Sequence, residues 1–424
     1  MANISVANFT DLNTACQTSN TITVTAPITV TSTITVPAGV TVNLTGAQLS
    51  TITAALRHFQ LNGDLELSNI TLDGGTTGGG IDMGNAQGTV SPTLTIDAGT
   101  VIQNCTAQKG GAVYGNQNAK ITMNAGEIND NSAAEYGGGI TCESGSTLDM
   151  TGGIVASNTA ARGGGIYIGT GSTATLTGTS APTSTLPTAP ATGTPAIVNN
   201  TATQDGGDGG GIFNNSGTLS ITNTLVQAND AANHGGGLFS NGGTINFTDS
   251  LISQNKVTIN ATTNGGGGIY LNSLTTTGLA TCTLTNTTVD SNTSVRAGGG
   301  VYLQNSVLDL NNSTISNNVA SLDGGGVFVG NSTNNVGQSS SLINAVGTNV
   351  ITNNNALNGG GLFSDMGNIF SIANIHFVNN AASGNGGGIY LQGSAPTLTS
   401  VSTGPNTVFS GNRATNGGGY YVAP

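Results

Sequence analysis

Hydrophobic and polar positions in this 424-residue chain follow a repeating pattern between Val101 and Tyr421. Each copy has an apolar residue, two spacers and Asn, followed five to eleven residues later by a glycine run and another apolar residue. The glycine halves end at positions such as Val113, Ile140 and Ile166, so the basic step is 27 residues and then 26, and insertions lengthen other copies. Self-similarity at this period predicts a solenoid.

Each copy contains three short runs rich in Thr, Val, Ile and Leu, with no room for a long helix. One set is Thr147 to Met150, Ile154 to Asn158 and Gly165 to Gly169, separated by Gly, Ser and Asn turns. Three strands per turn, each pairing with its copy about 4.8 Å away in the next turn, make a parallel β-helix. We therefore predict an all-β, single-stranded parallel β-helix with three short strands per coil.

The Asn of each copy predicts a structural ladder inside the solenoid. Asn tolerates the left-handed backbone conformation of a tight bend, and stacked copies pass amide hydrogen bonds from coil to coil. The glycines that follow allow close backbone approach. The predicted ladder consists of Asn104, Asn131, Asn158, Asn200, Asn229, Asn255, Asn292, Asn318, Asn354, Asn380 and Asn412.

The first hundred residues lack the Asn and Gly signature. Phe9 to Gln17 has the spacing of a short amphipathic helix, which we expect to cap the first coil. Strand-like segments from Thr21 onward then predict the first coils. We expect residues 1–100 to form this cap and the first coils, and residues 101–424 to form the regular repeats of one continuous solenoid. The last repeat half ends at Val422 without a cap, so we expect further chain or another molecule to cover its edge.

The charge balance excludes several classes of function. With a net charge of −12 and only seven Lys and Arg residues, the chain cannot form a phosphate track, so we expect no nucleic-acid partner. The absence of an apolar run approaching eighteen residues predicts no membrane insertion. Met1 is followed at once by a polar strand-like segment, and we expect an extracellular or cell-surface protein whose leader has been removed.

Aromatic residues share one register, immediately after the glycine and apolar residues. The two aliphatic residues of a Gly-Ile-Tyr-Leu strand share a face, and the ring takes the opposite face. If the aliphatic residues fill the core, the rings form an outer stripe, which either stacks from coil to coil or serves lateral association and sugar binding. The candidate binding residues are Tyr114, Tyr167, Phe213, Phe239, Tyr270, Tyr302, Phe328, Phe363, Tyr390 and Tyr421, and Thr141 interrupts the row.

Candidate catalytic residues do not repeat in register. Polysaccharide hydrolysis needs two carboxylates on one face, and a lyase needs a calcium-binding carboxylate cluster with a base. The acidic residues show no such spacing, and His58, His234 and His376 are scattered. We predict that the chain is not an enzyme and has no catalytic residue, metal ligand or cofactor. A polysaccharide lyase or hydrolase, or another carbohydrate-binding solenoid, remains the alternative.

Charged side chains and cysteines give weaker predictions. Two widened loops flank His234, and they form either solvated loops or a shallow groove with Asp205, Asp208 and Lys256. Alternating charges are expected to stack in three consecutive coils at Lys109, Glu135 and Arg162. The four cysteines fall at different registers, which favours small buried side chains over a disulfide or metal site, and they are Cys16, Cys105, Cys142 and Cys282.

The repeat resembles a known family. Phe409-Ser-Gly-Asn412 followed by a Gly-Gly-x-apolar element, as in Gly110-Gly-Ala-Val113, is similar to the repeats of polymorphic outer membrane proteins, the autotransported adhesins of chlamydiae. It is also similar to repeats of pectate-lyase-like surface adhesins. The resemblance implies a right-handed β-helix displayed outside the cell as an adhesin or stalk. Its expected partners are other copies of itself, in lateral or end-to-end filament assembly, or host and cell-surface glycans or proteins.

Overall fold

The computed structural model describes residues 1–51, 54–84, 91–182, 193–203, 206–259, 265–273, 279–330, 342–365, 370–392, 401–402 and 406–423. It is an all-β, right-handed parallel β-helix with 52% strand and 2% helix, as predicted. The chain divides into two compact units, and each is described by itself. Unit 1 comprises Met1–Ser180 and Thr185–Thr203, and unit 2 comprises Ala181–Ser184 and Gln204–Pro424.

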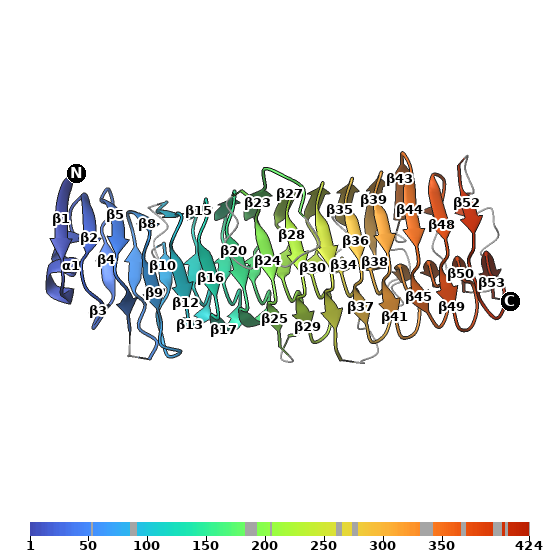
Figure 1. Cartoon of the computed structure of the whole chain (residues 1–424), viewed down its shortest axis with the longest axis horizontal. Helices are drawn as coiled ribbons and strands as arrows, with labels where there is room; N and C mark the ends of the chain where they lie inside the picture. Colours follow the sequence, from blue (N-terminus) through green and yellow to red (C-terminus); the bar gives the residue numbers. More distant parts are fainter. Residues whose placement is uncertain are drawn as a thin grey trace. The chain divides into compact units, whose positions relative to one another are not determined.

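In unit 1, strands of successive coils lie side by side in four parallel sheets, which we name A to D (Figure 1). Sheet A contains β1 (Ala2–Val6), β2 (Asn20–Val24), β5 (Thr41–Gly46), β8 (Asp64–Ser68), β11 (Thr93–Ile96), β15 (Lys120–Met123), β19 (Thr147–Met150) and β23 (Thr173–Thr177). Sheet B contains β3 (Ile28–Thr29), β6 (Leu49–Ser50), β9 (Thr71–Asp73), β12 (Val101–Gln103), β16 (Glu127–Asn129), β20 (Ile154–Ala156) and β24 (Ala196–Val198). Sheet C contains β4 (Ile34–Val36), β7 (Phe59–Leu61), β10 (Ile81–Met83), β14 (Val113–Gly115), β18 (Ile140–Cys142) and β22 (Ile166–Ile168). Sheet D contains β13 (Thr106–Lys109), β17 (Ser132–Tyr136), β21 (Thr159–Arg162) and β25 (Thr201–Ala202).

Unit 2 has strands in the same four sheets. Its sheet A strands are β27 (Thr218–Thr222), β31 (Thr244–Thr248), β35 (Ala280–Thr285), β39 (Ser306–Asn311) and β43 (Leu342–Val346). Its sheet B strands are β28 (Leu225–Gln227), β32 (Leu251–Ser253), β36 (Thr288–Asp290), β40 (Thr314–Ser316), β44 (Asn349–Thr352), β48 (Ile375–Val378) and β52 (Val408–Ser410). Its sheet C strands are β26 (Ile212–Asn215), β30 (Leu238–Asn241), β34 (Ile269–Asn272), β38 (Val301–Gln304), β42 (Val327–Gly330), β46 (Leu362–Ser364), β50 (Ile389–Leu391) and β53 (Tyr420–Val422). Its sheet D strands are β29 (Asp230–Ala231), β33 (Lys256–Val257), β37 (Thr293–Ser294), β41 (Val319–Ala320), β45 (Asn355–Ala356) and β49 (Ala381–Ala382), and β47 (Phe370–Ser371) pairs separately with β51 (Val401–Ser402).

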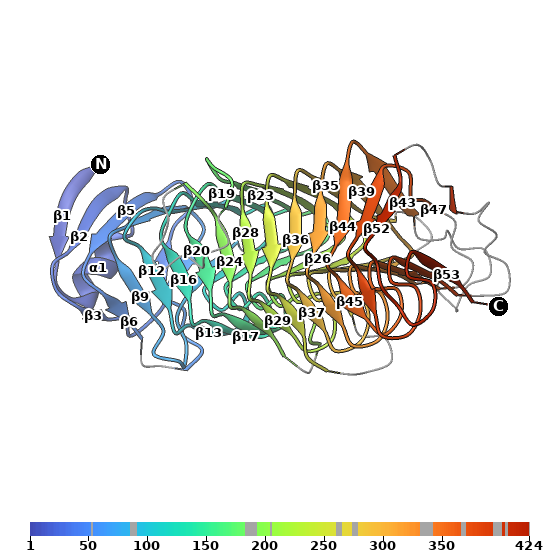
Figure 2. The same cartoon turned by 45° about the vertical axis from the view of Figure 1, so that its right-hand side comes forward.

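The fourth strand of each coil adds to the three expected from the sequence. It begins with β13, and in unit 2 the labels β29, β37 and β45 mark every second strand of this sheet along one side of the coils (Figure 2). These sheet D strands of unit 2 are two residues long, too short to show alternation in the sequence. Strands on either side of residue 100 pair in register, as β9 does with β12.

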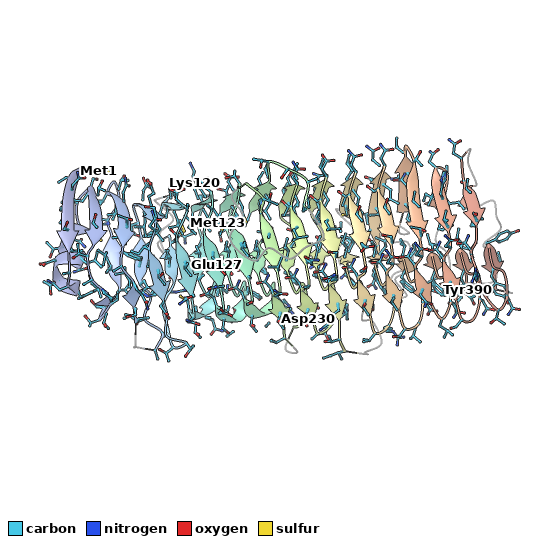
Figure 3. All side chains as sticks on the ribbon, in the orientation of Figure 1. Met1, Lys120, Met123, Glu127, Asp230 and Tyr390 are labelled. Atoms are coloured by element: carbon cyan, nitrogen blue, oxygen red, sulfur yellow. The ribbon has the colours of Figure 1, made fainter. Side chains whose placement is uncertain are left out.

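The core follows from alternation within each strand. Lys120 and Met123 belong to the same strand, β15, but Lys120 is exposed while Met123 is buried (Figure 3). Because the register is kept, Met123 pairs with Met150 and Ile121 pairs with Leu148 in the next coil. Apolar side chains therefore lie over apolar side chains from coil to coil, which removes them from water.

The amino-terminal helix is present, with a strand before it. The strand β1 pairs with β2, and α1 (Phe9–Ala15) follows it. Asn8 caps the helix, since its side chain accepts a 3.0 Å hydrogen bond from the Asp11 backbone N–H. Leu12 and Ala15 are buried. The buried face of the helix satisfies the expectation of a short capping helix.

The ladder forms from buried Asn side chains inside each unit. In unit 2, the Nδ2 of Asn292 donates to the Ile252 carbonyl and to the Oδ1 of Asn318, both at 3.0 Å. The Oδ1 of Asn292 accepts from the backbone N–H of Asn255 at 2.9 Å and from its Nδ2 at 3.0 Å. In unit 1 the same bonds join Asn131 to Asn158 and Asn158 to Asn200. Each carboxamide thus satisfies backbone and side-chain groups of adjacent coils.

Two details of the predicted ladder are wrong. Asn104 is not in the column, because β12 pairs Ile102 with Ile128, which places Cys105 level with Asn131. The Cys105 backbone N–H donates to the Oδ1 of Asn131 at 2.9 Å. The left-handed residue of the bend precedes the ladder position, as at Asn104 with φ of 54° and Asp130 with φ of 53°. The ladder Asn itself is selected for its amide groups and not for its backbone conformation.

Glycine is required next to the ladder because a Cβ there would clash with neighbouring atoms. A Cβ on Gly268 would lie 2.7 Å from the Gly300 carbonyl oxygen and 3.0 Å from the Nδ2 of Asn292. Gly266 has a φ of +68°, which also favours glycine. The two requirements explain why the repeat carries a run of glycines instead of one.

Candidate functional site

The aromatic row of unit 2 forms one column of stacked rings on sheet C. Eight rings from Phe213 to Tyr421 make successive pairs with centroids 4.5 to 5.5 Å apart. Tyr270 lies on the face of β34 opposite to Ile269 and Leu271, as alternation predicts. Stacking at these separations stabilises each pair by about 0.5–1.5 kcal/mol beyond the burial of area.

Most of these rings are covered from outside as well as stacked. Tyr270 is 2% exposed and Phe363 is 3% exposed. Ala297 packs with Phe328 and Phe363 in one buried cluster, with Tyr302 and Tyr390 at its border. The chain that enters the glycine run at Gly298 therefore lies over the ring column through Ala297. Between successive rings there is no free face on which a sugar could stack, so the geometry favours the stacking interpretation of the row.

The row is interrupted in unit 1. Thr141 occupies the register between Tyr114 and Tyr167, and Tyr167 stacks instead on Tyr136 at a centroid distance of 4.5 Å. The Tyr114 hydroxyl donates to the Oε2 of Glu143 at 2.9 Å. One coil earlier the register position of Tyr114 is taken by Asp82, and before that by Gln60. The ring column thus gives way to polar side chains in the first coils.

A cavity of about 690 Å³ lies at this transition, wholly within unit 1. Its apolar lining comes from Tyr114 and three alanines, Ala55, Ala107 and Ala134, and its polar lining comes from Arg57, Thr77, Asp82, Thr106, Gln108 and Lys109. Sequence reasoning missed this site, because the repeat was followed only from residue 101. The signal that could have found it is the carboxylate of Asp82 in the register of the rings.

Arg57 is held at the cavity by backbone oxygens. Its Nη2 donates to the Lys109 carbonyl at 2.7 Å, and its Nη1 donates to the carbonyls of Gly110 and Gly111 at 2.8 and 3.2 Å. Burial lowers the pKa of the Arg57 guanidinium, and the nearby Asp82 charge opposes this shift. An arginine stays protonated nevertheless, so a fixed positive charge borders the cavity.

Asp82 supplies an acceptor without a donor. Among the residues that the structure describes, none donates a hydrogen bond to its carboxylate or forms an ion pair with it within 4.0 Å. Burial raises the pKa of Asp82, and the Arg57 charge partly offsets this effect. A partly buried carboxylate that receives no hydrogen bond is unfavourable unless a solvent molecule or a ligand donates to it.

Lys109 lines the cavity and forms an ion pair with Glu143, which also accepts from Tyr114. The Lys109 Nζ lies 3.1 Å from the Glu143 Oε2 and 5.1 Å from the centre of the Tyr136 ring. The expected charge row through Glu135 is therefore wrong: a bulge in β17 pairs Tyr136, not Glu135, with both Lys109 and Arg162. Glu135 instead accepts a 2.8 Å hydrogen bond from Gln108.

A buried histidine lies beneath this region. The His58 Nδ1 accepts from the Gly80 N–H at 2.9 Å, which places the ring proton on Nε2, 3.2 Å from the Asp73 carbonyl oxygen. Burial lowers the pKa of His58 to about 4. The imidazole is therefore neutral at pH 7 and fully hydrogen bonded, as a structural histidine is.

The residues expected near the widened loops form two separate pairs. The His234 Nδ1 lies 2.7 Å from the Asp208 Oδ1, and the ring packs 4.6 Å from Tyr270. Lys256 pairs with Asp230 at 2.9 Å. Asp205 lies outside the described residues. In the described part of the chain, the structure does not bring these side chains together as one groove.

The described ranges contain neither a cluster of metal-binding side chains nor an exposed thiol. No cluster of three or more His, Cys, Asp or Glu side chains suited to a metal ion occurs in them. Cys16, Cys105, Cys142 and Cys282 are buried free thiols. Burial raises the pKa of Cys16, Cys105 and Cys142 to about 12, so these thiols are protonated and unreactive at neutral pH.

One stretch of unit 2 is similar to a known protein family. Residues 374–392 match the Chlamydia polymorphic membrane protein repeat. This match and the parallel β-helix fold fit a polymorphic outer membrane protein-like β-helix. The matched segment runs from β48 to β50 and contains the ladder residue Asn380 and the stacked ring of Tyr390. It therefore holds one copy of the Asn and glycine motif. No curated protein and no solved structure matches the chain. The described residues include no helix with the length and apolarity needed to cross a membrane.

Proposed function

We propose that this chain is an adhesive, structural β-helix displayed at the cell surface. The observation that carries the proposal is the match of residues 374–392, which hold β48, β49 and β50 of one coil, to a repeat named for membrane proteins of Chlamydia. Neighbouring coils are built alike, since Asn354, Asn380 and Asn412 are joined in the same ladder.

The energetics of the coils suit a scaffold. Ring stacking, the amide ladder and backbone pairing all act between adjacent coils, so each coil is held by its neighbours. Such a protein presents surface side chains on a fixed backbone, as an adhesin requires. The covered ring column gives no support to lateral filament assembly through that row. A partner is therefore expected to bind polar surfaces elsewhere, and cell-surface glycans or proteins are the proposed class.

Location and adhesion are tested separately. Antibody raised against the chain is applied to intact cells of the source organism, and labelling before lysis is expected. Labelling only after lysis would contradict surface display.

For adhesion, beads coated with the folded chain are expected to attach to cultured epithelial cells more than beads coated with the heat-unfolded chain. Equal attachment of the two bead types would refute an adhesive role that depends on the β-helix.

A further inference from the structure

The cavity at Asp82 has balanced charge. Two cationic groups, Arg57 and Lys109, border it, and Asp82 with Glu143 provides two anionic groups in the same network. Lys109 is engaged by Glu143, and the Arg57 guanidinium is turned onto carbonyl oxygens. Because these two cationic and two anionic groups balance, the site has no net charge that would attract an anionic or a cationic ligand. An uncharged ligand therefore suits the site.

The polar groups of the cavity are suited to hydroxyl groups. The carboxylate of Asp82 has acceptor positions that no described residue fills, and burial makes a donor favourable there. A hydroxyl is an uncharged group that donates to a carboxylate and, unlike an amide N–H, also accepts, so it suits a lining that includes the donors of Thr77 and Gln108. Hydrogen bonds to charged groups are stronger than neutral ones, so Asp82 is the expected centre of recognition.

The remaining lining is apolar. Tyr114 contributes ring surface, and Ala55, Ala107 and Ala134 contribute methyl groups. A ligand that presents C–H groups on one face and hydroxyls on its edges matches such a mixture, and the volume of about 690 Å³ falls within the usual range for small-molecule sites. Sugar rings have this division between face and edge.

We infer that this cavity binds a short, uncharged oligosaccharide whose hydroxyls donate to Asp82. The inference rests on the proposed function, because it names the class of surface ligand that the adhesin would recognise. It places recognition on the first coils of unit 1 and not on the ring column of unit 2.

Isothermal titration of the full chain tests the site with defined probes: cellotriose, maltotriose, chitotriose and, as the charged comparison, trigalacturonic acid. At least one neutral trisaccharide is expected to bind, and Asp82→Asn is expected to weaken it by about tenfold or more. Glu66→Gln is the matched control, since Glu66 is a partly exposed carboxylate on sheet A of the same unit. It should leave binding unchanged.

Several results would overturn the inference. They are no binding of any neutral trisaccharide, equal affinity of wild type and Asp82→Asn, or tighter binding of trigalacturonic acid than of all neutral probes. Circular dichroism and thermal unfolding check that each variant folds. If Asp82→Asn does not fold, Thr77→Trp takes its place: this exposed residue lines the cavity, and the larger ring should abolish binding by filling it.

The bead assay separates this inference from the proposed function. Attachment of coated beads without binding of trisaccharides would refute the cavity as a glycan site and leave adhesion standing. Binding of a trisaccharide that needs Asp82, together with beads that do not attach, would refute adhesion and leave the site standing.

Discussion

Removing one amide from the buried ladder is expected to open the coils on both sides of it. Asn292→Ala deletes the Nδ2 that donates to the Ile252 carbonyl and the Oδ1 that accepts from the Asn255 N–H. The Asn255 side chain keeps its 3.0 Å bond to the Val226 carbonyl, and the Asn318 Oδ1 keeps a 2.9 Å bond from the backbone N–H of residue 292. Two buried backbone groups therefore lose the partner that Asn292 provides.

The magnitude follows from those two groups. Each buried polar group left unsatisfied costs about 1–3 kcal/mol, so the pair gives about 4 kcal/mol of local destabilisation. Since each 1.4 kcal/mol is about tenfold, the hydrogen-exchange protection of amides around residue 255 should fall on the order of a thousandfold. A solenoid does not unfold as one two-state unit, so a local measurement is more informative than a single melting temperature.

The assay is hydrogen exchange followed by mass spectrometry of peptides covering residues 250–258 and 288–296. The matched control is Asn317→Gly, because Asn317 precedes a ladder residue, has a φ of 54° and donates at 2.7 Å to the partly exposed Asp290 carboxylate, which also accepts from Ser316. Glycine tolerates that backbone conformation, so protection should change little. Equal loss in the two variants, or a loss below about tenfold in Asn292→Ala, would refute the role given to the ladder.

Three further predictions address other contacts. His58 has a folded pKa of about 4, below its unfolded value near 6.5, so the unfolded state binds a proton that the folded state does not bind. The free energy of unfolding should therefore fall between pH 6.5 and 4, by up to about 3 kcal/mol. Denaturant unfolding at pH 7 and pH 4.5 should show this fall, and His58→Asn should reduce the difference between the two pH values. Gly268→Ala should destabilise the fold by about 1–3 kcal/mol, because the added Cβ would lie 2.7 Å from the Gly300 carbonyl oxygen. A Cβ on Gly39 would meet no atom within 4 Å, so Gly39→Ala should show only the smaller cost of its φ of +75°. Similar thermal unfolding of both variants would contradict the steric argument. Phe328→Ala should lower the free energy of unfolding by about 3–5 kcal/mol, because it removes a 9% exposed ring from between two rings whose centroids lie 4.5 and 5.1 Å away. An unchanged near-ultraviolet circular dichroism spectrum and an unchanged denaturant midpoint would count against stacking as a stabilising contact.

The sequence by itself determined the fold class, because both signals in the repeat are local. Alternation predicts which side of a strand enters the core, and a constant step places like side chains over one another. Ile269 and Leu271 inside and Tyr270 outside could therefore be predicted without coordinates, and so could a ladder through Asn292. The prediction fails at Asn104 because Ile102, and not Val101, occupies the core position of that copy.

Only the tertiary structure decided what covers the outer faces and where a cavity lies. Ring burial depends on how the chain before each glycine run returns over sheet C, as Ala297 does at Phe328, and no periodicity reports that path. The cavity depends on an irregular segment: Arg57 reaches carbonyls at Lys109 and Gly110, more than fifty positions along the chain. Contacts between equivalent residues of neighbouring coils follow from the repeat period. Contacts of a residue outside the repeat, such as Arg57, depend on the course of the backbone in space.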